Sequence, residues 1–278
     1  LARQPSAVPQ EKIVAFNNFG LEYFWKLRRA HTASKVTQIY LWAGDKINDL
    51  ALSCWNHDTK VVYGYNSACE KLFQSLCRDG VIRIMEQTIA PIASEAAILS
   101  SEQEWAFESF EKSYDDFQEQ LIEREKHEWQ LAEHIVCGSE FVRDEVIAQG
   151  GSPNKCFVVP YGVQSPPSPY LRDTPNKYDT LRILFVGSIC VRKGLRYLFE
   201  AMQKLRGRNV KCRVVGPISL PQNVLRRYVP SNVEIVGPVP RSEIAREYRA
   251  ANVFCLPSLC EGSATVIYEA LAAGLPVV

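Results

Sequence analysis

The stretch RILFVGSICVRKGLRYLFEAMQKL, residues 182–205, places an apolar strand, a loop that begins with glycine and an amphipathic helix in immediate succession. The pattern then repeats: further strands are expected at 211–215, 233–236, 253–256 and 275–278, and helices at 223–228, 241–250 and 265–273. Strict alternation of strands and helices is typical of a parallel sheet with helices on both faces. Residues 181–278 are therefore predicted to form an α/β domain that binds its ligand beyond the carboxyl ends of the strands.

A second run of the same kind precedes a proline-rich segment. Short strands are expected at 135–137 and 156–159, and between them Ser139 is expected to cap a helix over 141–149. The polar segment that follows contains Pro166, Pro167, Pro169 and Pro175, which is typical of a connection between domains. We therefore divide the chain into an N-terminal domain over residues 1–164, a linker over 165–180 and a C-terminal domain over 181–278.

Residues 1–132 give a weaker pattern. Apolar runs at 36–42, 60–65 and 81–85 predict short strands, and the stretch 92–137, which lacks Gly and Pro, predicts mostly helix. Apolar residues recur there at intervals of three and four: Phe107, Phe110, Tyr114, Phe117 and Leu121. This stripe predicts an amphipathic helix packed on a sheet. A coiled coil is the alternative, although the heptad weakens after Leu121.

Composition and charge argue against several classes of function. The chain has 32 basic and 31 acidic residues, so no overall field favours nucleic acid or an anionic membrane. No stretch approaches the ~18 uninterrupted apolar residues of a membrane span. The nine cysteines are scattered without a CxxC pair, which favours reduced thiols over disulfides or a zinc site. His127 and His134 lie seven residues apart without a further ligand nearby, so we expect no metal site there.

The first loop with residues that could bind a ligand follows the strand that ends at residue 186. Gly187 and Ser188 open it, and the cations Arg192 and Lys193 stand directly before a helix. Backbone amides at a helix N-terminus, together with Arg and Lys, form a site for phosphate oxygens. The same residues are also common at solvated helix starts, so this loop alone leaves both interpretations open.

The loop PSLCEGSATVIYE, residues 257–269, is more specific. Glu261 lies in the loop and Glu269 eight residues later inside a helix, with small residues between them that let a ligand reach the backbone. Glu269 stands among Val266, Ile267 and Ala270, an apolar setting in which a carboxylate needs partners. Because carboxylates accept hydrogen bonds from vicinal hydroxyls, we interpret the pair as a sugar-nucleotide site rather than as two helix-start acids.

These residues resemble the E-x7-E signature of the family 4 glycosyltransferases, the group 1 enzymes of the GT-B fold. The resemblance covers residues 133–278 and takes in the segments at 139–142, 160–163, 187–198, 214–217 and 236–239, whereas residues 1–132 are similar only loosely. It implies an α/β protein with two facing Rossmann-like domains, each with a parallel sheet.

The resemblance also implies a role for each matching position. Arg192 and Lys193 would bind the donor pyrophosphate as it leaves, and Glu261 would contact the donor sugar near the reacting carbon. Glu269 would hold the ribose hydroxyls. The donor-binding site would be completed by Gly187, Ser188, Val239, Gly262, Ser263, Ala264, Thr265 and Val266. Such enzymes retain the anomeric configuration, use a UDP- or GDP-sugar as co-substrate, and need no metal or other cofactor.

The chain departs from the family pattern in several places. Ser188 stands where many members carry an arginine, which leaves Arg192 to share the pyrophosphate with Lys193. No glycine-rich loop or histidine of the N-terminal domain is matched, and the corresponding strand end reads Glu86-Gln87-Thr88. The sequence starts without Met and stops in the middle of an expected sheet, so we expect both domains to be incomplete. We also expect this chain by itself to be poorly soluble and inactive in sugar transfer.

The predicted function is transfer of a hexose-like sugar, with retention, to a hydroxyl of a glycan, lipid-linked or small-molecule acceptor in cell-surface glycan or polysaccharide synthesis. We expect a cytoplasmic enzyme, with peripheral contact at the inner membrane face left open and no nucleic-acid partner. Two alternatives remain: a non-catalytic sugar-nucleotide-binding subunit, and a GT-B sugar-nucleotide epimerase that would use Glu86. A dinucleotide oxidoreductase is disfavoured because no GxGxxG follows a strand.

Overall fold

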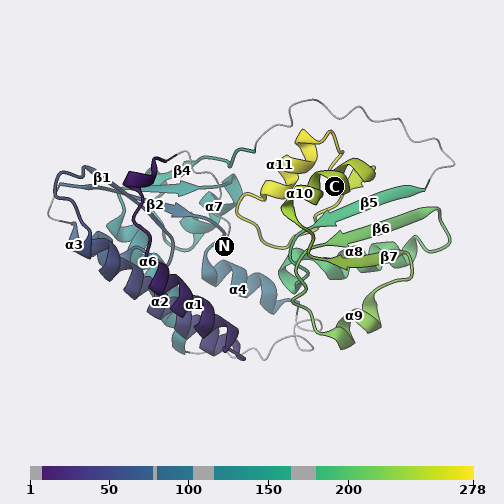
Figure 1. Cartoon of the computed structure of the whole chain (residues 1–278), viewed down its shortest axis with the longest axis horizontal. Coiled ribbons are helices and arrows are strands. Elements are labelled where there is room, and N and C mark those ends of the chain that lie inside the picture. The colour runs from purple at the N-terminus through teal and green to yellow at the C-terminus, as the bar shows by residue number, and fades with distance from the viewer. Residues whose placement is uncertain (1–7, 78–79, 103–115, 164–179) are drawn as a thin grey trace.

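The computed structural model describes residues 8–77, 80–102, 116–163 and 180–278. Within these ranges the chain forms two separate parallel sheets of four strands each, at the two ends of its long axis, with helix α4 (Ile92–Ser100) between them (Figure 1). The α/β architecture with parallel sheets is therefore confirmed. The linker expected at 165–180 lies, apart from residue 180, outside the described residues.

The first sheet has the order β1-β2-β3-β4. Its strands are β1 (Val61–Tyr65), β2 (Ile82–Gln87), β3 (His134–Cys137) and β4 (Cys156–Val158). Three helices cover one of its faces: α3 (Glu70–Ser75), α6 (Asp116–Leu131) and α7 (Glu140–Ala148). The core between them contains Phe73, Met85 and Ile135, all fully buried. Ser139 caps α7 as expected, because its hydroxyl accepts the N–H of Val142 at 3.3 Å.

The apolar run at 36–42 does not form the expected strand. It lies inside helix α2 (Ala33–Ser53), which packs beside α1 (Asn17–Arg28). Thr32 caps α2 by accepting the N–H of Lys35 at 3.2 Å. The prediction was wrong because a short apolar run does not distinguish a strand from a buried helix segment. A 3-10 turn, Gln10–Lys12, precedes α1, and another, Pro153–Lys155, precedes β4.

The stretch expected to be mostly helix divides into α4 and α6 within the described residues. Phe107, Phe110 and Tyr114 lie outside them, whereas Leu121 lies in α6 and is 7% exposed. The packed amphipathic helix is therefore supported for the part of the stripe that the structure describes.

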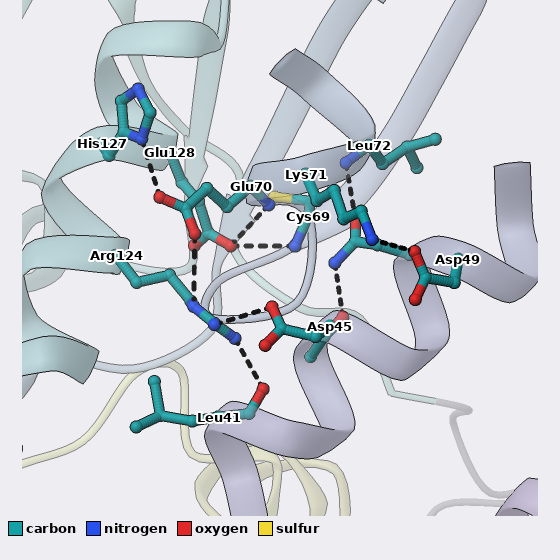
Figure 2. A network of polar contacts seen from close by, with 12 residues as sticks. Leu41, Asp45, Asp49, Cys69, Glu70, Lys71, Leu72, Arg124, His127 and Glu128 are labelled. Carbon is teal, nitrogen blue, oxygen red and sulfur yellow. Dashed lines mark hydrogen bonds and ion pairs between the residues drawn. The ribbon is translucent and has the colours of Figure 1, made fainter. Parts of the chain in front are cut away.

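The C-terminal half of α6 ties the first domain together through buried carboxylates (Figure 2). Glu128 accepts the backbone N–H groups of Ser67, Cys69 and Glu70 at 2.6, 2.8 and 3.0 Å. One turn earlier in α6, Arg124 donates to the Leu41 carbonyl of α2 at 2.9 Å. These bonds fix α2, α3 and α6 relative to the end of β1.

The second sheet has the order β7-β6-β5-β8. Its strands are β5 (Leu181–Val186), β6 (Val210–Val215), β7 (Val233–Gly237) and β8 (Val253–Phe254), and Val277 makes an isolated parallel bridge to Phe254. Helices α8 (Leu195–Lys204) and α9 (Gln222–Tyr228) cover one face, and α10 (Arg241–Ala250) and α11 (Thr265–Ala272) cover the other. The predicted alternation is confirmed, with β8 shorter than expected.

The order of the second sheet reverses between β5 and β8, because β6 and β7 lie on one side of β5 while β8 lies on the other. In open parallel sheets, ligands bind at such a reversal, beyond the carboxyl ends of the two strands that flank it. The loops that follow β5 and β8 are the two that the sequence singled out. The fold therefore brings both to the expected place.

No described helix is both long and apolar enough to cross a membrane. All nine cysteines are free thiols, and Cys69, Cys137, Cys212 and Cys260 are buried.

Candidate active site

The two predicted loops contact each other directly. The backbone N–H of Leu259 donates to the carbonyl of Arg192 at 2.9 Å, and the Arg192 guanidinium donates to the carbonyl of Cys260 at 2.8 Å. Arg192 and Lys193 belong to a 3-10 turn, Val191–Lys193, directly before α8. The reciprocal bonds hold the turn and the Glu261 loop in one fixed arrangement.

Gly194 makes this close approach possible. Its φ is +66°, and a Cβ at this position would lie 1.8 Å from the carbonyl oxygen of Pro257. A side chain here would therefore adopt an unfavourable left-handed conformation and also push the two loops apart. The glycine sets the distance between the cations of the first loop and the carboxylate of the second.

The three residues expected to be catalytic form one cluster. The Lys193 ammonium forms an ion pair with Glu261 Oε1, and Arg192 Nη1 lies 3.6 Å from Glu261 Oε2. These side chains are only 11% (Lys193) and 24% (Arg192 and Glu261) exposed, so the charges interact in a partly water-excluded site. Two cations beside a carboxylate can bind an anionic leaving group while the carboxylate accepts hydrogen bonds from hydroxyls.

Glu269 lies in a different set of contacts. Its Oε2 accepts the hydroxyl of Tyr248 at 3.0 Å, and its Oε1 lies 4.0 Å from Arg241 Nη2. Tyr248 is buried, and burial together with the Glu269 charge raises the pKa of its hydroxyl, which keeps it a donor. The Glu269 side chain itself is 29% exposed, so the expected apolar setting is only partial. Its accessible carboxylate is free to bind a further polar group.

The small residues between the two glutamates face the first domain as well as the helix start. Gly262 is buried against the carbonyl of Thr88, and Ser263 Oγ accepts the Tyr161 N–H at 3.3 Å and hydrogen-bonds Tyr268 Oη at 2.9 Å. Ala264 is the N-cap of α11, so Thr265 and Val266 place their amides in its first turn. Such amides carry partial positive charge and suit an anion.

The remaining predicted positions border the cluster or the sheet. Gly187 follows β5 and donates its N–H to the Val215 carbonyl at 2.9 Å, and the Ser188 carbonyl accepts the N–H of Cys190 at 3.1 Å. Val239 follows β7 and packs on the core beneath α10 and α11. None of these contacts tests whether Val239 belongs to the donor-binding site, so that role stays a prediction.

Glu86, the residue considered for an epimerase, is occupied by two tyrosines. Its carboxylate accepts the hydroxyls of Tyr63 and Tyr161 at 2.7 and 2.5 Å, and the residue is 8% exposed. Burial and the bond to Glu86 raise the pKa of both tyrosines, so both hydroxyls stay protonated donors. This arrangement is that of a structural carboxylate and does not favour acid/base catalysis.

Sequence reasoning missed Glu95, which approaches the cluster from the first domain. Its Oε1 lies 3.5 Å from Arg192 Nε, and burial raises the pKa of its carboxyl while Arg192 opposes that shift. The sequence did contain an indication of Glu95, because this residue comes shortly after the carboxyl end of β2, where parallel sheets place functional groups. In the described residues, no three His, Cys, Asp or Glu side chains gather as a metal site.

The solved structures that the chain resembles in fold include GT-B glycosyltransferases. The chain aligns with sucrose-phosphate synthase from Thermosynechococcus elongatus at a TM-score of 0.62 and 20% identity, over 85% of this chain and 60% of that one. It aligns with the lipopolysaccharide outer core galactosyltransferase WaaB at a TM-score of 0.54 and 13% identity, over 87% of this chain and 60% of that one. The two facing parallel sheets and the loops at the reversal of the second sheet thus define a protein of the GT-B fold.

The last third of the chain is similar to a known family. Residues 180–278 match the family described as glycosyl transferases group 1. The D-inositol 3-phosphate glycosyltransferase of Kineococcus radiotolerans is 31% identical over 172 residues, which cover 54% of this chain and 40% of that protein. The amylovoran biosynthesis glycosyltransferase AmsK of Erwinia amylovora is 30% identical over 152 residues, 50% of this chain and 37% of that protein. Residues 180–278 are thus similar to the group 1 glycosyltransferases, and the matched residues span less than half of either relative.

Proposed function

We propose that this chain belongs to a retaining glycosyltransferase of family 4 that moves a sugar from a nucleoside diphosphate donor to a hydroxyl acceptor. The observation that carries the proposal is the cluster of Arg192, Lys193 and Glu261 at the reversal of the second sheet. One structural neighbour, HepE from Anabaena, was solved in complex with UDP and glucose, which supports a nucleotide-sugar donor.

In the proposed reaction the acceptor oxygen forms a bond to the anomeric carbon of the donor sugar. The bond from that carbon to the phosphate oxygen breaks, and the nucleoside diphosphate leaves with the electron pair. The acceptor proton passes to the departing phosphate. Arg192 and Lys193 stabilise the negative charge that develops on this leaving group, a kind of effect that often dominates catalysis.

The remaining residues bind the donor. Glu261 accepts hydrogen bonds from the sugar hydroxyls, and the amides of Thr265 and Val266 face the phosphates. Glu269, held by Tyr248, accepts hydrogen bonds from the ribose. Protein cations take the part that a divalent metal plays in other transferases, so the reaction needs no metal. The name of the Erwinia relative supports a role in polysaccharide synthesis, with the acceptor reached in the cytoplasm or at the inner membrane face.

Product analysis tests the proposal. A full-length version of the enzyme, which is also the protein used in every activity measurement below, is incubated with UDP- and GDP-sugars and a panel of hydroxyl acceptors. The products are separated and their anomeric configuration is determined by NMR. We expect a new glycoside with the donor's configuration. An inverted product contradicts the retaining mechanism, and an epimerised donor, or donor binding without any product, contradicts the transferase.

A further inference from the structure

A cavity of about 650 Å³ opens in the first domain, between α1 and α2 on one side and α4 and α6 on the other. Its volume lies in the range of about 300–1,000 Å³ that is usual for small-molecule sites. The walls are largely apolar, with side chains contributed by all four helices: Phe19, Tyr23, Tyr40, Ile47, Leu99 and Leu121. Such walls favour an apolar ligand, because burying apolar surface is the main source of its binding free energy.

The cavity is polar where it meets the carboxyl ends of β1 and β2, and we call this part its polar end. Asn66 and Thr88 line it, but their side chains are bonded to each other, since the Thr88 hydroxyl donates to Asn66 Oδ1 at 2.9 Å. Glu95 lines it too. In the described part of the chain the Glu95 carboxylate accepts no hydrogen bond, although its side chain is only 29% exposed. A partly buried carboxylate in this state has open acceptor positions for the hydroxyl of a ligand.

Glu95 also joins the cavity to the proposed donor site. Its Oε1 lies 3.5 Å from Arg192 Nε, and the other end of the same guanidinium reaches Glu261 and the Cys260 carbonyl. Helix α4, which carries Glu95, is the helix between the two sheets (Figure 1). A hydroxyl bound to Glu95 would therefore lie one side chain away from the residues that hold the donor.

We propose that this cavity binds the acceptor, that the acceptor is an uncharged hydroxyl compound with an apolar body, and that Glu95 accepts a hydrogen bond from its hydroxyl. The inference rests on the proposed transferase function and names the acceptor class. A phosphorylated acceptor does not fit, because its phosphate would meet the negative charge of Glu95 at the polar end. The chain would differ in this from relatives named D-inositol 3-phosphate glycosyltransferases.

The first test uses three soluble probes with the same sugar head. Octyl β-glucoside below its micelle concentration, methyl β-glucoside and glucose 6-phosphate are titrated into the protein by calorimetry. We expect the octyl compound to bind at least about tenfold more tightly than the methyl compound, since burial of even a few methylene groups is worth that factor. Equal affinities, or tighter binding of the phosphate, overturn the inference.

Paired substitutions on α4 localise the binding. Ala96 lines the cavity and Ala97, the next residue, is exposed. Ala96→Trp should weaken octyl glucoside binding at least about tenfold by filling the cavity, whereas Ala97→Trp should leave it unchanged. If Ala96→Trp fails to fold, Ala43→Leu fills the cavity from the α2 wall instead. Unchanged binding in a folded cavity variant places the probe elsewhere and overturns the inference.

Glu95→Ala tests the polar end. We expect octyl glucoside affinity to fall by about tenfold or more, the usual scale for a hydrogen bond to a charged group. UDP and GDP affinity, measured on the same samples, should not fall. Unchanged probe affinity removes Glu95 from the acceptor site. If the unmodified protein binds UDP or GDP but does not prefer the octyl compound, this inference alone is contradicted. If the unmodified protein binds neither nucleotide, the proposed function is contradicted.

Discussion

Gly262 lies so close to the carbonyl oxygen of Thr88 that a Cβ on Gly262 would come within 1.8 Å of it. Gly262 belongs to the loop between β8 and α11, and Thr88 follows β2, so the contact joins the carboxyl-end loops of the two sheets. Ser263, the next residue, continues it by accepting the N–H of Tyr161 at 3.3 Å. The loop with Glu261 is therefore positioned by the backbone of the first domain as well as by its own.

Gly262→Ala should disturb catalysis because the added methyl group must displace backbone rather than a flexible side chain. A displacement of about 1 Å at a site of this kind can cost about 10²-fold in rate, so we expect a loss of that size in initial rate. Gly162→Ala is the matched control, since a Cβ there meets nothing within 4 Å. Equal rates for the two variants would mean that the loop does not need its contact with Thr88 during turnover.

In a full-length version of the enzyme, Lys193→Ala should lower turnover by about 10²–10³, the scale for losing one preorganised stabiliser of developing charge. The loss should appear in kcat, because the charge on the leaving group grows most in the transition state. Lys204→Ala, at the exposed end of α8, controls for the loss of a positive charge. A fall of less than threefold would move the pyrophosphate role away from Lys193.

Glu269→Ala should act mainly on the donor KM, because ribose contacts are similar in the ground and transition states. We expect an increase of about tenfold to 10²-fold, the range for hydrogen bonds to a charged group. Tyr248→Phe removes the hydroxyl that holds Glu269 and should raise the donor KM by a smaller factor. Collapse of kcat with an unchanged donor KM would refute the ribose assignment.

Activity should survive EDTA, because in the proposed mechanism Arg192 and Lys193 stabilise the charge of the leaving group without a metal ion. The measurement is the initial rate before and after dialysis against the chelator. Loss of rate that Mg²⁺ or Mn²⁺ restores would show that the two cations are insufficient and would contradict the metal-free mechanism.

The sequence predicts the second domain well because its strands and helices alternate with clear boundaries. Glycine, charged or small residues close each apolar run, as Gly187 does after β5. The meeting of Lys193 with Glu261 also follows, since parallel strands bring their carboxyl ends to one edge of a sheet. The strand prediction for residues 36–42 was wrong for the opposite reason. A run of only seven residues fits the repeat of a strand as well as that of a helix. The helix is favoured by the cap at Thr32 and by the packing of α2 against α6.

Contacts between the two halves of the chain have no such local pattern. Glu95 meets Arg192, and Thr88 meets Gly262, only because of how the two sheets face each other. These pairs are far apart in the sequence, and no spacing or composition marks them. The two loops of the proposed donor site can therefore be predicted from the sequence, whereas the residues that face them from the first domain are found only from the structure.

The last prediction concerns Glu128, which is fully buried in α6 and accepts three backbone N–H groups around the start of α3 (Figure 2). Burial outweighs these bonds and raises the pKa of its carboxyl from 4.5 to about 7. Between these values the folded protein holds a proton that the unfolded chain has lost. The stability that this proton contributes is complete below pH 4.5 and is lost as the pH rises towards 7, at up to about 1.4 kcal/mol per pH unit.

Urea unfolding at pH 5 and pH 7.5 measures this change in the free energy of unfolding, and Glu128→Gln, which does not titrate, should reduce the change. Glu123→Gln, an exposed position on the same helix, should not. Stability that rises over this interval, or an identical slope in Glu128→Gln, would show that the three N–H groups keep Glu128 ionised in the fold.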